Sequence, residues 1–138
     1  MFLDLGCGRV DYRTLGASQR YEYIGIDYNS PDVTFLADAL ALPFRTNSPS
    51  FTMSMAVLKH LQYPFVAMRE VQRILKAGCP FFGTVAFQEP FQRDSYYHHS
   101  HLGTLNTLLA AGFEAQKIAP NDKWPVLVAQ AHMGYCFP

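Results

Sequence analysis

Residues 2–8 read FLDLGCG, an apolar run that stops at two closely spaced glycines. The run Phe2–Leu5, broken only by Asp4, predicts a short buried strand that ends at Gly6. Gly6 and Gly8 allow a tight turn and a close approach of the backbone to a ligand, because neither residue carries a Cβ. The stretch therefore predicts a strand followed by a glycine turn, which is either a ligand-binding loop or a plain strand-to-helix connection.

Outward from this turn, short apolar runs alternate with helical patterns, which is typical of βαβ units and a mostly parallel sheet. We expect further strands over Tyr23–Asp27, Val33–Leu36, Phe51–Met55, Phe81–Phe87 and Phe113–Ile118. We expect helices over Tyr12–Gln19, Val66–Lys76 and Leu102–Ala111, and a helical tail with apolar residues at Trp124, Leu127, Val128 and Ala131. The pattern predicts a single α/β domain that spans residues 1–138.

The composition excludes several classes of protein. Of the 138 residues, 49% are hydrophobic and 16% charged, which excludes a disordered chain and a charge-rich coiled coil. Eleven basic side chains balance eleven acidic ones, so no basic face for nucleic acid or an anionic membrane is expected. The three cysteines form no CxxC pattern, and neither a signal peptide nor a membrane span is recognisable, which predicts a reduced, cytoplasmic protein.

Two carboxylates at the carboxyl ends of predicted strands each suit a different part of one ligand. Asp4 lies beside the glycine turn, where it would repel a pyrophosphate and attract a cationic amino group. Asp27 ends the second strand about 20 residues later, where a carboxylate can accept hydrogen bonds from both hydroxyls of a ribose. Asp27 could equally cap the turn that follows it. The third glycine of a dinucleotide fingerprint is replaced by Asp11, which argues against a nicotinamide dehydrogenase.

A third carboxylate, Asp38, follows the third predicted strand. Its side chain could accept a hydrogen bond from the exocyclic amine of an adenine, with Ala39 leaving room for the ring, or it could be an ordinary exposed acid of a loop. Amine, ribose and adenine along one line of strand ends describe S-adenosylmethionine.

The chain resembles a known family, the class I S-adenosylmethionine-dependent methyltransferases, and within it the small-molecule type called methyltransferase domain 11. Six ordered segments carry the resemblance: FLDLGCG, YIGIDYNSP, ADALALPF, AVLKHLQYP, MREVQRILKAGC and HLGTLNTLLAAGFE. The resemblance implies a doubly wound, Rossmann-like sheet of strand order 3-2-1-4-5, which in this chain continues into the short sixth strand Phe113–Ile118.

The resemblance also implies S-adenosylmethionine as the cofactor and a set of residues that bind it. The methionine part matches Asp4, Gly6 and Gly8, with Cys7 in the same turn, and the ribose matches Asp27. Adenine matches Tyr28, Asp38 and Ala39, and the sulfonium side of the cofactor matches Met55 and Ala56.

The chain departs from the family at both ends of the sheet. Met1 opens directly into the first strand, so we expect a domain without the family's N-terminal cap helices. No seventh strand is recognisable after Phe113–Ile118, so the tail or a homodimer partner would have to cover the edge of the fifth strand.

A base is needed for methyl transfer only when the acceptor is a protonated oxygen or nitrogen. The candidates are His98 and His99, in a histidine-rich segment after the fifth strand, since a neutral histidine accepts protons near pH 7. A metal site and a plain surface loop are the alternatives for that segment, and we expect no metal. The predicted function is methyl transfer to a small-molecule acceptor, and the alternative is a non-catalytic module that binds the cofactor or a partner protein.

Overall fold

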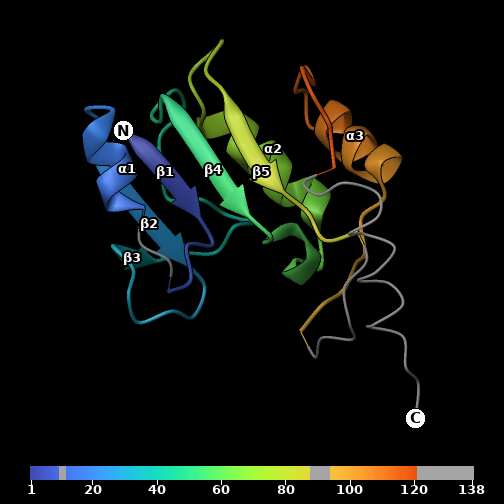
Figure 1. Cartoon of the computed structure of the whole chain (residues 1–138), viewed down its shortest axis with the longest axis horizontal. Coiled ribbons are helices and arrows are strands. Elements are labelled where there is room, and N and C mark those ends of the chain that lie inside the picture. Colours follow the sequence, from blue (N-terminus) through green and yellow to red (C-terminus); the bar gives the residue numbers. More distant parts are fainter. Residues whose placement is uncertain (10–11, 88–93, 121–138) are drawn as a thin grey trace.

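The computed structural model describes residues 1–9, 12–87 and 94–120 and contains a five-stranded sheet, in which all neighbouring strands are parallel (Figure 1). The strands are β1 (Phe2–Leu5), β2 (Tyr23–Asp27), β3 (Phe35–Leu36), β4 (Phe51–Met55) and β5 (Phe81–Thr84). Their order is β3-β2-β1-β4-β5, so the predicted doubly wound α/β sheet is confirmed. The predicted bounds of β1, β2 and β4 are also confirmed.

The described residues also form four helical segments: α1 (Arg13–Ser18) between β1 and β2, the 3-10 turn η1 (Leu58–His60) and α2 (Pro64–Ile74) between β4 and β5, and α3 (His101–Ala110) after β5. Helix α2 starts at Pro64, whose fixed φ and missing N–H suit a first helical position. Helix α3 starts after Ser100, whose side-chain oxygen accepts a 3.1 Å hydrogen bond from the amide of Gly103.

The main core lies on the face of the sheet that α2 covers. Alternate residues of a strand point to opposite faces, and Leu3 and Leu5 of β1 pack with Ile26 of β2 against α2. The α2 side chains in this core repeat at helical spacing: Ala67, Met68, Val71 and Ile74. Burial of this stripe holds α2 behind β4 and β5 (Figure 1).

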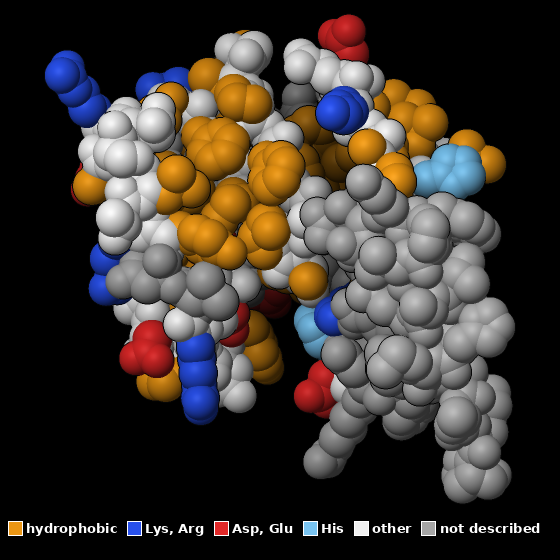
Figure 2. Space-filling view, viewed as in Figure 1, with side chains coloured by type: hydrophobic (Ala, Val, Ile, Leu, Met, Phe, Trp, Pro, Cys, Tyr) orange, Lys and Arg blue, Asp and Glu red, His pale blue; other side chains and the backbone are white. Residues whose placement is uncertain are grey.

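The opposite face is covered by α1 at one end, where Gly16 lies against the side chains of Phe2 and Tyr23. Farther along this face, Phe82 of β5 is 53% exposed. Figure 2 shows hydrophobic side chains gathered over the middle of this face. An open apolar hollow of about 230 Å³, lined by Phe2, Leu15, Gln19, Tyr21 and Phe51, lies at the amino ends of β1 and β4.

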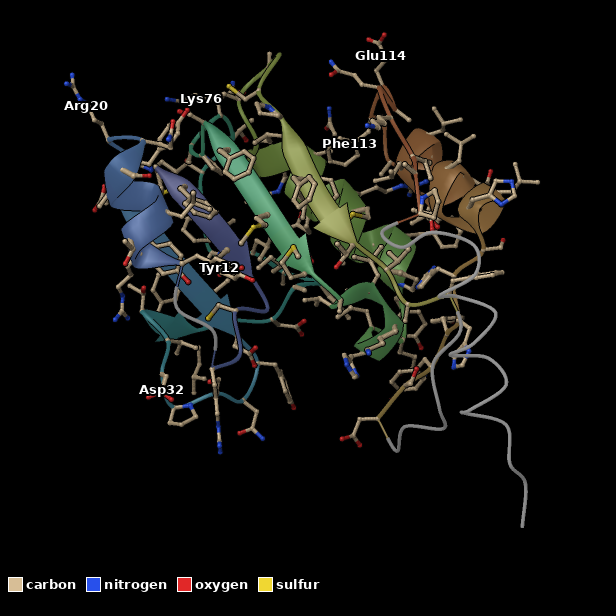
Figure 3. All side chains as sticks on the ribbon, in the orientation of Figure 1. Tyr12, Arg20, Asp32, Lys76, Phe113 and Glu114 are labelled. Atoms are coloured by element: carbon tan, nitrogen blue, oxygen red, sulfur yellow. The ribbon has the colours of Figure 1, made fainter. Side chains whose placement is uncertain are left out.

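The predicted sixth strand over Phe113–Ile118 is wrong. The amide of Phe113 donates to the carbonyl of Leu108 at 3.0 Å and so closes the end of α3, and its ring packs on Phe81 at 5.4 Å. Figure 3 shows Phe113 between β5 and α3. Among the described residues, no strand pairs with the outer edge of β5. The predicted helical tail lies outside the described residues.

Two other predicted strands are shorter than expected. Strand β5 stops at Thr84, and the carbonyl of Ala86 accepts a hydrogen bond from the amide of His99 instead of continuing the sheet. Strand β3 has two residues. Just before it, Thr34 binds Gly25 through both its backbone and its side chain: its amide donates to the Gly25 carbonyl, and its hydroxyl accepts from the Gly25 amide.

Candidate functional site

The candidate site lies at the carboxyl ends of the strands. The strand order reverses between β1 and β4, and in open α/β sheets ligands bind at the carboxyl edge beside such a reversal. Hydrogen bonds at this edge join the segments that follow β1, β2 and β3. The sequence-predicted cofactor residues are therefore brought to one edge of the sheet.

The glycine turn is fixed by both its conformation and its packing. Gly6 has φ +70° and Gly8 has φ +56°, which an L side chain rarely adopts. The amides of Gly6 and Cys7 both donate to the carbonyl of Ile26, at 2.8 and 3.1 Å. A Cβ at Gly6 would lie 2.3 Å from the side chain of Val57, whereas a Cβ at Gly8 would meet nothing within 4 Å. The turn is thus packed at Gly6 and open at Gly8.

Asp27 ties the glycine turn to the loop after β2. Its Oδ2 accepts from the amide of Gly8 at 3.0 Å, and its Oδ1 accepts from the amide of Asn29 at 2.9 Å. The hydroxyl of Ser30 adds a second link by donating to the Gly8 carbonyl at 2.7 Å. Each carboxylate oxygen can accept more than one hydrogen bond, and Asp27 is only half-buried, so it caps the turn and is still able to accept from a ligand.

Asp4 is a buried carboxyl beside the same turn, with 1% of its surface exposed. The hydroxyl of Tyr23 donates a 2.8 Å hydrogen bond to its Oδ2. Burial raises the pKa of Asp4 to about 6, against the lowering effect of the Tyr23 hydrogen bond, and the negative charge of Asp27 raises it further. A carboxyl that is costly to ionise alone and lies near a second carboxylate is suited to a cationic ligand group. The residues present therefore fit the ammonium and ribose of S-adenosylmethionine.

Cys7 lies between the glycines and is buried. Burial raises the pKa of its thiol to about 11, and the charges of Asp4 and Asp27 contribute to the rise. The thiol is therefore protonated at neutral pH, and it serves here as a small apolar side chain rather than a nucleophile.

Asp38 and Ala39 follow β3 and are joined to β2 through a hydrogen bond of 2.9 Å from the amide of Ala37 to the carbonyl of Asp27. Asp38 is exposed, and its Oδ1 accepts from the amide of Leu40 at 2.8 Å. Ala39 is buried in the core. The other predicted adenine residue, Tyr28, is 79% exposed at the same edge, after β2.

Met55 and Ala56 end β4 beside the glycine turn. Ala56 has φ +58°, a conformation that costs an alanine about 1–2 kcal/mol. Its amide donates to both the carbonyl and the hydroxyl oxygen of Thr84, each at 3.1 Å, which holds the strained residue in place. Strain of this kind concentrates at functional sites.

Four residues of the site were not among the sequence-predicted ones: Tyr23, Ser30, Val57 and Thr84. Tyr23 can be found only once the β1–β2 register is known, because that register sets Gly25 opposite Asp4 and leaves space above the sheet. The other three depend on contacts between distant segments.

The two candidate bases lie at the carboxyl end of β4 and β5 rather than beside the glycine turn. Their segment is fastened to η1, because the amides of Tyr96 and Tyr97 both donate to the carbonyl of Lys59 and the Tyr97 hydroxyl donates to the carbonyl of Gln62. His98 is exposed and His99 is buried.

The ring of His99 has a distinctive environment. Burial lowers its pKa, against the effect of a hydrogen bond with the backbone of Leu58, and the neighbouring His98 lowers it further. Its Nε2 has no hydrogen-bond partner among the described residues. The neutral ring has a free lone pair for a proton, but this nitrogen is buried in the structure.

Two further features are absent from residues 1–9, 12–87 and 94–120. No group of three or more His, Cys, Asp or Glu side chains there could hold a metal ion. No helix in the same ranges is long and apolar enough to cross a membrane.

Residues 3–82 match the sequence model of the methyltransferase domain family. Among curated proteins, none matches the chain.

Solved structures share the fold. A putative methyltransferase from Haloferax volcanii, in complex with the Trm112 methyltransferase activator, has a TM-score of 0.70 and 23% identity over 80% of this chain and 60% of its own. An S-adenosylmethionine-dependent methyltransferase from Mesorhizobium loti has a TM-score of 0.73 and 17% identity over 96% of this chain and 82% of its own. The [4+2]-cyclase SpnF has a TM-score of 0.66 and 25% identity over 82% of this chain and 51% of its own. The chain thus spans 60% and 51% of the lengths of the Haloferax protein and SpnF.

Proposed function

The chain belongs to the methyltransferase domain family of class I S-adenosylmethionine-dependent enzymes, and from this we propose that it transfers a methyl group from S-adenosylmethionine to a small-molecule acceptor. The observation that carries the proposal is the hydrogen bond from Gly8 to Asp27, which sets a half-buried carboxylate beside the buried Asp4 at the glycine turn. The same proposal takes residues 1–138 as one cofactor-binding domain.

S-adenosylmethionine, when bound, supplies a methyl group that is already activated by its sulfonium. The protein's contribution is then to position the reactants and exclude water. Asp27 accepts from the ribose hydroxyls, and Asp4 balances the ammonium. The open side of Gly8 leaves room for the ligand, and Asp38 and Tyr28 lie where the adenine is expected.

The acceptor side is formed by the segment that η1 holds at the carboxyl end of β4 and β5. His99 is proposed as the base because its ring is neutral at pH 7 and its Nε2 has no hydrogen-bond partner among the described residues, although burial lowers its pKa and so makes it a weaker base than an ordinary histidine. His98 is exposed and is assigned to the rim of the site. An acceptor that carries no proton on the reacting atom would need neither ring.

Titration calorimetry with S-adenosylhomocysteine tests the proposal. Asp27→Ala should weaken binding by about 1–3 kcal/mol, because charge-assisted hydrogen bonds to the ribose are lost. Asp32→Ala is the matched control, since Asp32 is an exposed acid of the same loop and should leave binding unchanged. Equal affinities for the wild type and Asp27→Ala would exclude the ribose assignment.

The alternative is a module that binds the cofactor or a partner protein without catalysis. Two observations favour it: the Nε2 of His99 is buried, and Phe82 is exposed on a sheet face that α1 covers only at one end. The complex of the Haloferax neighbour with its activator gives a precedent for a protein partner within this fold. Cofactor binding without methyl transfer across an acceptor screen would support the alternative, and release of S-adenosylhomocysteine with any acceptor would exclude it.

A further inference from the structure

Tyr23, at the start of β2, is hydrogen-bonded to the buried acid of the site on the same face of the sheet. Strands β1 and β2 are paired so that Phe2 lies beside Tyr23 and Asp4 beside Gly25. The Tyr23 side chain therefore starts two residues away from Asp4 along the strand and reaches back to it, with its hydroxyl 2.8 Å from Oδ2 of Asp4.

The space for this reach is provided by a glycine. A Cβ at Gly25 would lie 2.8 Å from the Tyr23 hydroxyl, 3.1 Å from its Cε1 and 3.0 Å from the sulfur of Cys7. A side chain at residue 25 would therefore displace the Tyr23 hydroxyl from Asp4. Tyr23 and Gly25 act together, because Tyr23 donates the hydrogen bond and the missing side chain of Gly25 leaves the space that the Tyr23 hydroxyl occupies.

The Tyr23 ring is held on its other sides. Phe2 packs edge-on against it, with ring centroids 5.3 Å apart and planes at 88°. The guanidinium of Arg13, at the start of α1, lies 5.9 Å from the ring centroid. A ring fixed in this way holds its hydroxyl in one place, which is what the orientation of a carboxylate requires.

The bond has a direct chemical consequence for the carboxyl group. A hydroxyl that donates to Oδ2 stabilises the ionised form of Asp4 and fixes the plane of the carboxylate. Two charged groups near this pair among the described residues are Asp27 of β2, which disfavours the ionised form, and Arg13 of α1 over the ring. The Cys7 thiol beside the pair stays protonated.

We propose that Tyr23 is a positioning residue for ammonium recognition, which orients the Asp4 carboxylate and keeps it ionised so that it binds the charged amino group of the cofactor. This inference rests on the proposed function, since the cofactor supplies the amino group. It assigns a role to a residue at the start of β2, outside the glycine turn and the acids that follow the strands.

Two ligands separate this role from a general effect on the site. S-adenosylhomocysteine carries the amino group, and 5′-methylthioadenosine contains the same nucleoside without it. In the full chain, Tyr23→Phe keeps the ring and removes the hydroxyl. We expect its affinity for S-adenosylhomocysteine to fall about tenfold, as for a lost hydrogen bond to a charged group, and its affinity for 5′-methylthioadenosine to be unchanged.

The pH profile is the second measurement. Wild-type affinity for S-adenosylhomocysteine should rise with pH as Asp4 ionises, and Tyr23→Phe should shift this rise to higher pH. Gly25→Ala, which displaces the hydroxyl while Tyr23 remains, should produce the same ligand-selective loss. Tyr21→Phe is the matched control, because Tyr21 is partly exposed and lies in the hollow at the opposite edge.

The outcomes are distinct. Loss of affinity for the amino-containing ligand alone, with the shifted pH profile, supports the role. Equal weakening of both ligands by Tyr23→Phe and Gly25→Ala, or unchanged affinity for both ligands, overturns it while leaving the proposed function intact. A folded wild type that binds neither ligand overturns the proposed function and this inference together.

Discussion

Val57 occupies the space that a side chain at Gly6 would need: its Cγ2 lies 2.3 Å and its Cγ1 2.9 Å from an ideal Cβ at that residue. The turn after β1 and the connection after β4 are thereby packed against each other at the candidate site. This contact gives the two glycines of the turn different constraints, although both have positive φ.

Gly6→Ala should therefore destabilise the protein more than Gly8→Ala. Each alanine is in a left-handed conformation, which costs about 1–2 kcal/mol. At Gly6 the displacement of Val57 adds about 1–3 kcal/mol of overpacking, and at Gly8 there is open space. Urea unfolding of the two variants measures the difference, and equal losses would show that Val57 yields without cost.

Asp4→Asn should stabilise the protein at neutral pH. The folded pKa of Asp4 is raised from 3.8 to about 6, so the folded state binds more protons than the unfolded state between these values. Stability contributed by Asp4 therefore falls as pH rises from about 4 to about 6 and stays low above that range. Asparagine can still accept from Tyr23 without ionising.

The measurement is the difference in unfolding free energy between Asp4→Asn and the wild type, taken from pH 4 to pH 7. It should grow with pH and then level off. Asp32→Asn, an exposed acid in the loop after β2, serves as the control. A difference that does not change with pH would mean that Asp4 ionises as freely in the folded chain as in the unfolded one.

The contribution of His99 to the unfolding free energy should change with pH in the direction opposite to that of Asp4. Its folded pKa is lowered, so the unfolded state binds more protons below the ordinary pKa of 6.5, and stability falls as pH falls through that region. His99→Gln should remove this loss, and His98→Gln should not, because His98 is exposed. Thermal unfolding at pH 7 and pH 5 compares the variants; the same acid sensitivity in His99→Gln as in the wild type would contradict the buried, neutral ring.

The opposite pH dependences of the stability contributed by Asp4 and by His99 have a practical result. As pH falls below about 6, the stability contributed by Asp4 rises while that contributed by His99 falls, so the wild-type stability profile alone understates both. Only the variants separate them.

The strand positions and the carboxylates at their carboxyl ends were predictable because they depend on short-range patterns, whereas the sheet order was predicted from the family resemblance. An apolar run such as Phe2–Leu5 that stops at a glycine turn favours a buried strand, and the carboxyl ends of neighbouring parallel strands share one edge. The bond from Tyr23 to Asp4 was not predicted, because it depends on the β1–β2 register and on the space above Gly25.

The error over Phe113–Ile118 has a similar origin. Phe113 and Ala115 are half-buried and Glu114 is exposed, so the alternation that suggests a strand is real. The backbone nevertheless closes the end of α3, because the amide of Phe113 bonds to Leu108 after Gly112 turns the chain at φ +93°. Periodicity records which side chains are buried and does not record where the amides bond.

The short connection over residues 56–60 supports both halves of the proposed reaction centre. Its Val57 side chain is packed against the glycine turn, and the Lys59 carbonyl holds the segment that carries the histidines. We therefore expect acceptor selectivity and cofactor affinity to be coupled in the proposed enzyme. A change that reshapes the segment over residues 94–99 for a new acceptor will be transmitted through this connection to the cofactor side, so selection for one property also constrains the other.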